Sequence, residues 1–201
     1  MLPAGGGFLL EDLASSAGFT PEDFTEEQRQ IASTADRFMT EEVLPNVEEY
    51  EAQKPGLART LMAKSGALGL LGVLVPEEYG GSEMDLTTSV IVDERMGRYA
   101  SFSTTHGAHS GIGTLPLVLF GTEHQKRRYL PRLVTGEWIA AYCLSESHAG
   151  SDALAARTRA DLSPDGSHYI LNGEKMWISN GGIADFYTVF AKVDAEKFTA
   201  F

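Results

Sequence analysis

Apolar residues recur every three or four positions through the first part of the chain, which is the spacing of one helical face. The clearest case follows Thr25, where Ile31, Ala35 and Phe38 fall on one face. The letters TEEQ at its start match a capping box, in which Thr25 caps the first turn and Gln28 reaches back to it. The pattern therefore predicts a helix that begins at Thr25.

Further helices are predicted by the same start and stop signals. They cover Leu57 to Ser65 with Gly66 as the stop, a span capped by Asp85 that runs to about Tyr99, a glycine-rich span from Gly107 to Phe120, and a span opened by Thr122 and ended by Gly136. Between the first two, the proline and glycine residues of VPEEYGG predict a loop. This half of the chain is expected to be all-helical.

After Trp138 the pattern changes to short runs of β-branched and aromatic residues. The letters SPDGS and the later NG pair are typical of hairpin turns. The expected strands cover 138–144, 155–161, 168–172, 175–179 and 185–193. Helices followed by strands favour an α+β fold, with an all-helical domain before an antiparallel, barrel-like β domain.

Three segments follow from this pattern. Residues 1–24 mix glycine, proline and acids and are interpreted as a tail, 25–137 as the helical domain, and 138–201 as the β-rich domain. The last letters, KFTAF, look like the start of another strand. We therefore expect a truncated sheet and a chain that is a fragment of a longer protein.

The composition limits the class of protein only loosely. The chain has 201 residues, of which 43% are hydrophobic, so a packed core is expected. The net charge of −12 argues against a nucleic-acid partner, because phosphate binding depends on clustered lysine and arginine. The one cysteine, Cys143, lies in the apolar run AAYCL, so we expect a buried, inert thiol and no intrachain disulfide.

No membrane or export signal is evident in the sequence. No apolar run approaches the ~20 residues that span a bilayer. The first residues, MLPAGGGFLLEDL, lack the basic region and long apolar core of a secretory signal. We therefore expect a cytoplasmic protein, and peripheral association with a membrane surface stays open.

Three common kinds of site find little support. Five histidines are present, with His106 and His109 three apart, but no HExxH or CxxC pattern completes a metal site. The surroundings of Ser110 and Ser151, AHSGI and AGSDA, do not match the G-x-S-x-G turn of a hydrolase. The letters GIGTLP begin like a dinucleotide fingerprint, but Pro116 replaces its third glycine and no parallel βαβ unit surrounds it. Its glycines are expected to allow close helix packing instead.

Two predicted strand ends share one chemical character. YCLSE and WISNGG each place aromatic or apolar residues before a hydroxyl and then flexible backbone. A flat ring with polar edges, such as a flavin, needs apolar contacts on its faces and donors at its rim, which Ser145 and Ser179 would supply. The alternative stays open that Tyr142 and Trp177 are core aromatics and the serines form turns.

Several motifs in one order resemble the acyl-CoA dehydrogenase family of flavoproteins. AYCLSESHAGSD resembles the family's first signature, and LNGEKMWISNGGIADFYTVFAK resembles its second. VPEEYGG and FGTEHQKRRYLPRLVTGE resemble stretches of its helical domain. The resemblance covers roughly residues 25–201 and is greatest to the very-long-chain branch.

The resemblance implies roles for particular residues. Those that would line FAD, with the Ser179 hydroxyl near the flavin N5, are Tyr142, Leu144, Ser145, Trp177, Ile178 and Ser179. Ser151 would face the bound acyl-CoA. The family's catalytic base is a glutamate on a C-terminal helical bundle that is absent here. Glu146 matches an acid that the family does not use as the base, so no catalytic residue is assigned.

The implied reaction is the α,β-dehydrogenation of an acyl-CoA, of long chain, to a trans-2-enoyl-CoA in fatty acid β-oxidation. FAD would be the cofactor, an electron-transfer flavoprotein the acceptor, and a homodimer or homotetramer the full-length assembly. We expect the 201 residues alone to be inactive. The pair Ser147-His148 departs from the family's usual Pro-Gly or Pro-Ser, which leaves that loop's contacts open. The alternatives are an acyl-CoA oxidase or flavin monooxygenase of the same fold, or a non-catalytic interaction module.

Overall fold

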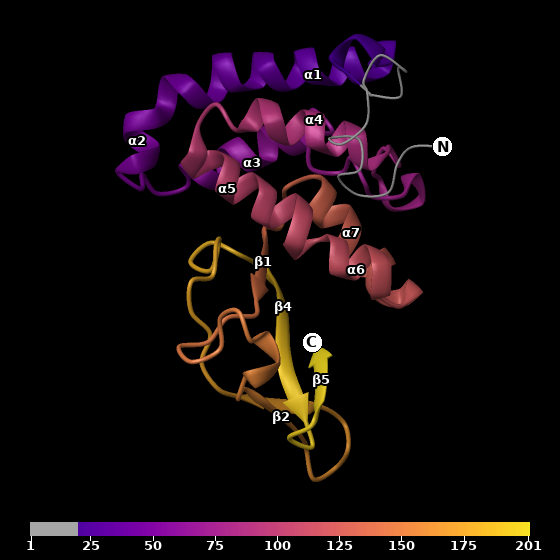
Figure 1. Ribbon diagram of the computed structural model, residues 1–201, viewed down its shortest axis with the longest axis vertical. Coiled ribbons are helices and arrows are strands. Elements are labelled where there is room, and N and C mark those ends of the chain that lie inside the picture. The colour runs from indigo at the N-terminus through magenta and orange to yellow at the C-terminus, as the bar shows by residue number, and fades with distance from the viewer. Residues whose placement is uncertain (1–19) are drawn as a thin grey trace, which may run out of the picture.

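The computed structural model describes residues 20–201, with helices gathered at one end and a sheet at the other (Figure 1). This order confirms the expected helical region followed by a β region. The expected tail, residues 1–24, lies mostly outside the described residues. Within its described part, Pro21–Asp23 forms the short 3₁₀ helix η3.

The helical region consists of α-helices joined by 3₁₀ and π segments. After η3 it comprises α1 (Glu26–Phe38), η4 (Met39–Val43), η5 (Leu44–Asn46), α2 (Val47–Glu51), α3 (Leu57–Ala67), η6 (Glu77–Tyr79), α4 (Leu86–Met96), α5 (Ala100–Gly107), η7 (Ala108–Gly113), α6 (Leu115–Phe120) and α7 (Glu123–Val134). The segments η4 and η7 are π-helical. None of the described helices combines the length and apolarity needed to cross a membrane.

The three predicted N-caps are confirmed. The hydroxyl of Thr25 accepts a hydrogen bond from the Gln28 amide at 3.1 Å, and the Gln28 side chain accepts from the Thr25 amide at 3.0 Å. Thr122 and Gln125 form the same capping box before α7. The Asp85 carboxylate caps α4 by accepting from the Thr88 amide. These contacts satisfy amides that the first helical turn leaves without intrahelical partners.

Two predicted helix boundaries are wrong. Gly66 lies inside α3 instead of ending it, because its missing side chain is needed for packing: a Cβ there would lie 2.3 Å from the Thr135 carbonyl oxygen. The helix expected from Gly107 to Phe120 begins earlier, at Ala100, and is interrupted by η7. The spacing of apolar residues does not predict where an α-helix changes to a π-helix, because that change depends on tertiary contacts.

The main core lies between the helices. Phe102 is fully buried, and its ring packs against Phe38 at a centroid distance of 5.7 Å. Ile139, which precedes the first strand, belongs to this core. A second buried cluster includes Leu130 and Leu133 of α7 together with Ala140. The entry to the sheet is therefore packed into the helical region.

The sheet is mixed, not antiparallel as predicted. Its strands are β1 (Ala140–Cys143), β2 (Arg159–Leu162), β3 (Tyr169–Asn172), β4 (Phe186–Val193) and β5 (Lys197–Ala200), with a short helix η8 (Ala153–Ala155) before β2. The order is β1-β4-β2-β3, and β5 pairs with β4. Both β1 and β2 run parallel to β4, while β3 and β5 are antiparallel to their partners. Within the described residues β1 and β3 do not pair, so the sheet stays open.

Strand positions were predicted unevenly. The SPDGS hairpin between β2 and β3 is confirmed, with Leu162 opposite Tyr169, and KFTAF does begin a strand, β5. The segment 175–179 is not a strand. Trp177 and Asn180 have positive φ angles of 59° and 65°, which a strand does not tolerate. The alternation of apolar and polar residues therefore predicted one strand too many.

Candidate functional site

The two predicted strand ends meet at one cavity of about 240 Å³. Its lining residues are Ile112, Tyr142, Leu144, Ser145, Trp177, Ile178 and Ser179. The structure thus brings together every residue that the sequence assigned to the flavin, and adds Ile112. We call residues 142–145 the first lip and 177–179 the second lip.

The first lip continues directly from β1. Along this strand Ala141 and Cys143 are buried, whereas Tyr142 and Leu144 are partly exposed. Successive side chains of a strand point to opposite faces, so Tyr142 and Leu144 share the face that lines the cavity. The ring of Tyr142 packs against Phe190 of β4 at 5.0 Å between centroids. The sheet therefore fixes the direction of this lip.

The second lip is a turn and not a strand. Trp177 adopts the left-handed conformation and its side chain is 86% exposed at the cavity. Asn180 holds the end of the turn: its side-chain amide donates to the carbonyls of Thr105 in α5, at 2.9 Å, and of Ala140 in β1, at 3.1 Å. Left-handed non-glycine residues cost free energy and are concentrated at functional sites. The cavity edge is thus built by an anchored, strained turn.

The cavity offers the chemistry that a flat ring with polar edges requires. Leu144 and Ile178 give apolar surface, and Trp177 gives an aromatic face. In the described part of the chain, the hydroxyls of Ser145 and Ser179 make no hydrogen bond to another protein group. Both hydroxyls are therefore available to a ligand, and the residues present fit a flavin.

Glu146, beside the first lip, is a structural carboxylate and not a free base. It is 5% exposed and accepts hydrogen bonds from the amides of Arg157, at 2.6 Å, and Thr158, at 3.0 Å. The Thr158 hydroxyl and the Lys175 ammonium group donate at 2.5 Å and 2.8 Å. Burial by itself raises the pKa of Glu146, but these donors outweigh it and hold the pKa at about 2.

The sequence missed how the helical region reaches the cavity. The π segment η7 carries Ile112 to the lining, and Gly113 lets it approach β1, because a Cβ there would lie 2.7 Å from that of Ala140. His109, in the same segment, accepts from the Ala140 amide through Nδ1 at 2.9 Å. Its Nε2 then donates to the Leu133 carbonyl at 3.0 Å. Burial lowers the pKa of His109 to about 4, which keeps this bridging imidazole neutral.

Ser151 is not among the residues that line the cavity. It is exposed in the turn after the first lip. His148 lies in the same turn, with Nε2 3.5 Å from a Glu146 carboxylate oxygen. Cys143 is buried, and burial raises the pKa of its thiol, in accord with the expected inert cysteine.

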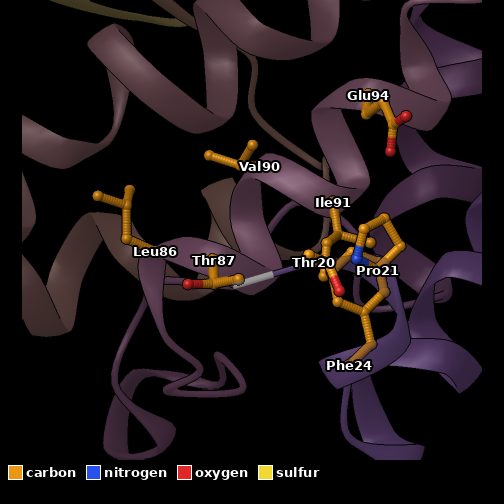
Figure 2. Close-up of a pocket in the computed structure, with 8 residues that line it drawn as sticks. All are labelled: Thr20, Pro21, Phe24, Leu86, Thr87, Val90, Ile91 and Glu94. Carbon is orange, nitrogen blue, oxygen red and sulfur yellow. The ribbon is translucent and has the colours of Figure 1, made fainter. Parts of the chain in front are cut away.

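Larger cavities occur elsewhere, so size does not identify the site. One of about 460 Å³ lies between η3 and α4, and its lining includes Leu86 and Val90, which are 68% and 59% exposed (Figure 2). Another, of about 530 Å³, lies between α6–α7 and β4–β5. Among residues 20–201 no group of three or more His, Cys, Asp or Glu side chains is placed to hold a metal ion. The cavity between the lips is chosen because its seven lining residues combine apolar and aromatic side chains with two serine hydroxyls, as a flat ring with polar edges requires.

Two family models match the chain. The model described as "Acyl-CoA dehydrogenase, N-terminal domain" matches residues 25–137, and "Acyl-CoA dehydrogenase, middle domain" matches 141–201. A probable acyl-CoA dehydrogenase of Bacillus subtilis (strain 168) is 50% identical over 197 residues, which are 98% of this chain and 33% of that protein. The mitochondrial very long-chain specific acyl-CoA dehydrogenase of Homo sapiens is 46% identical over 144 residues, 67% of this chain and 22% of that protein.

Solved structures agree with these matches. The crystal structure of an acyl-CoA dehydrogenase complexed with FAD from Bacillus anthracis aligns with a TM-score of 0.93 at 50% identity, covering 98% of this chain and 34% of that chain. The chain thus spans about one third of the length of the two Bacillus relatives. Several kinds of acyl-CoA dehydrogenase match at comparable identity, so the very-long-chain branch is not singled out. Since the two family models cover nearly all the described residues, the chain belongs to the acyl-CoA dehydrogenase family.

Proposed function

We propose that this chain forms the flavin-holding part of an FAD-dependent acyl-CoA dehydrogenase. The observation that carries the proposal is the single cavity that the two lips share, with unengaged hydroxyls on Ser145 and Ser179. The FAD complex of the Bacillus anthracis relative supports the choice of cofactor. The two lips would hold the ring by its faces and its rim.

The proposed reaction is the removal of a proton from Cα and a hydride from Cβ of an acyl-CoA, which gives a trans-2-enoyl-CoA. FAD, when bound, supplies the hydride acceptor. The chain's own part is to place the ring and to provide donors where reduction adds negative charge. Ser179 would donate near N5 and Ser145 elsewhere on the polar rim, while Leu144 and Ile178 exclude water.

The described residues do not supply the base for proton removal. No carboxylate lines the cavity, and Glu146 is fully engaged by donors that keep it ionised and occupied. A general base must be within hydrogen-bond reach of the proton that it removes. We propose that these residues alone do not turn over substrate, and that the base comes from another part of the protein.

The double variant Trp177→Ala plus Ser179→Ala tests the site. Each lost hydrogen bond is worth ~1 kcal/mol, and the lost ring contact somewhat more, so the FAD Kd should rise roughly fiftyfold or more. FAD binding would be followed by quenching of flavin fluorescence in the protein expressed with any residues that its gene adds after Phe201. The matched control is Ser167→Ala on the β2–β3 turn, which should leave the Kd unchanged. Equal FAD affinity in the double variant and wild type would refute the site.

Substrate, acceptor and assembly are further parts of the proposal. We propose a long-chain acyl-CoA whose thioester end passes Ser151, an electron-transfer flavoprotein as acceptor, a homodimer or homotetramer, and a role in fatty acid β-oxidation. The location proposed is cytoplasmic. The motive for proposing a long chain is the 46% identity to a very long-chain specific relative, and an isovaleryl-CoA dehydrogenase at 40% identity makes a short branched chain the competing outcome. Bleaching of the flavin absorbance by C4, C8 and C16 acyl-CoAs, compared at equal concentration, tests it.

The alternatives give different outcomes in the same preparation. An acyl-CoA oxidase or a flavin monooxygenase would reoxidise rapidly in oxygen after reduction, whereas a dehydrogenase would wait for its protein acceptor. A non-catalytic interaction module would be colourless. A yellow protein that bleaches with acyl-CoA and stays reduced in air would support the dehydrogenase.

A further inference from the structure

We infer that Glu146 and Lys175 are positioning residues for the flavin cavity, because their ion pair fixes the first lip against the second. The inference rests on the proposed function, since it concerns how that cavity holds its ring. Neither side chain lines the cavity. Their effect would pass through the neighbouring residues of each lip.

The lips need such a device because no strand ladder joins them. The first lip follows β1, whose partner in the sheet is β4. The segment 175–179 belongs to no strand. Among the described residues a single backbone hydrogen bond links residues 144–146 to 175–179, from the Met176 amide to the Ser145 carbonyl at 3.0 Å. Asn180 fixes the far end of the second lip on the Ala140 carbonyl, so this one backbone bond is what remains to set the separation and angle of the lips at the near end, by Lys175 and Met176.

Lys175 supplies the missing links. Its ammonium group donates to the Leu144 carbonyl at 2.9 Å and to Glu146 Oε1 at 2.8 Å. The side chain of Lys175 is 10% exposed and that of Glu146 is 3% exposed. Removing one partner of a buried ion pair leaves the other charge without compensation. The pair therefore tolerates little movement of one lip relative to the other.

Glu146 also ties the lips to a third segment. Its carboxylate accepts from the amides of Arg157 and Thr158 ahead of β2. Glu146 follows Ser145 directly, and Lys175 lies two residues before Trp177. Loss of the pair should thus shift the hydroxyls of Ser145 and Ser179 relative to each other. If these hydroxyls no longer reach the polar rim of the ring, FAD binds more weakly. The reduced ring is then also less stabilised, which lowers the midpoint potential of the flavin.

Lys175→Met and Glu146→Gln test the inference. Lys175→Met keeps the chain length and removes the charge, while Glu146→Gln places an amide donor among donors. Each should raise the FAD Kd about tenfold and lower the flavin midpoint potential. The double variant should lose little more than the worse single variant, because the two groups act as a unit. Lys175→Arg keeps the charge and should bind FAD within about threefold of wild type.

A matched control comes from a second ion pair that joins distant segments. Arg59 on α3 bonds Asp185 at 2.9 Å, and neither residue lines this cavity. Arg59→Met should lower thermal stability and leave the FAD Kd and the midpoint potential unchanged. If Glu146→Gln does not fold, the comparison of Lys175→Met with Lys175→Arg decides.

The outcomes separate the two proposals. A wild-type protein that takes up no FAD would overturn the proposed function and this inference with it. Wild type that binds FAD, with Lys175→Met equal to it in Kd and midpoint potential, would overturn the inference alone. Weaker binding in Arg59→Met of the same size as in Lys175→Met would also overturn it, because the effect would then be general destabilisation.

Discussion

The helical region and the sheet region of this chain are held together differently. In the helical region large side chains such as Phe102 and Met39 are fully buried in one core. In the sheet region the whole of β3 is exposed, and Trp177 stands in solvent. There the important positions are held by polar contacts, above all those of Glu146. Stability and site geometry therefore reside in different parts of the molecule.

The largest expected contrast is between buried aromatics of the two regions. Phe102→Ala should lower the free energy of unfolding by about 3–5 kcal/mol, because the site lies deep in the packed core. Phe190→Ala in β4, which is only partly buried, should cost about half as much or less. Guanidinium unfolding of both variants measures the difference. Equal losses would contradict the contrast between the regions.

The pH dependence of stability should separate the regions by window. Burial lowers the pKa of His106 from 6.5 to about 3, so the unfolded chain binds a proton that the folded chain refuses. Stability should then fall as pH drops from 6.5 toward 3, by up to about 1.4 kcal/mol per pH unit for this residue, and the part of this window above pH 4.5 separates the histidine from the carboxylate Glu146. His106→Met should reduce that slope by this amount, as measured by urea unfolding at several pH values, and leave the part due to His109, whose folded pKa of about 4 gives a loss of stability in the same window. A variant slope equal to that of wild type would contradict the assignment to His106.

The sheet region should respond only at lower pH. The folded pKa of Glu146 is about 2, below its ordinary 4.5, so its contribution is complete above 4.5 and is lost as pH falls from 4.5 toward 2. Glu146→Gln should leave the slope between pH 6.5 and 4.5 unchanged and reduce it below 4.5. If Glu146→Gln changed the slope of stability only between pH 6.5 and 4.5, the loss of stability below pH 4.5 would be wrongly assigned to Glu146.

Backbone packing provides a smaller test within the helical region. Gly66→Ala should cost about 1–3 kcal/mol, because its Cβ would lie 2.3 Å from the Thr135 carbonyl oxygen. Gly107→Ala, also helical but with no atom within 4 Å of the added Cβ, should be neutral or stabilise by up to about 1 kcal/mol. Thermal unfolding of the pair reports the difference. Matching shifts in Tm would mean that the close approach of α3 to Thr135 is not important.

The smallest expected effect concerns a single cap. Thr122→Ala should destabilise by about 1 kcal/mol, because the Gln125 amide at the start of α7 loses the hydroxyl that accepts its hydrogen bond. Thr199→Ala on exposed β5 should change stability by less than about 0.5 kcal/mol. Chemical unfolding resolves these values. A larger loss at Thr199 would place more stability in the sheet edge than the structure indicates.

Much of the candidate site could be predicted because its residues lie in two short motifs. Tyr142 lies in β1 and Ser145 follows it, while Trp177 and Ser179 lie in the other motif, so two short stretches of sequence contain nearly all the lining residues. Ile112 could not be found in this way, because only the π segment and its contact with β1 bring it to the cavity.

The sequence by itself determined the capped helix starts, the hairpin between β2 and β3, and the residues of both lips. These depend on interactions within a few residues of each other, such as the bond from the Gln28 amide to the Thr25 hydroxyl. The tertiary structure alone decided that β1 and β2 run parallel to β4, that 175–179 is an anchored turn, and that Lys175 bridges Leu144 and Glu146. Those features join segments far apart along the chain, and their free energy depends on burial and partner geometry that no local pattern contains.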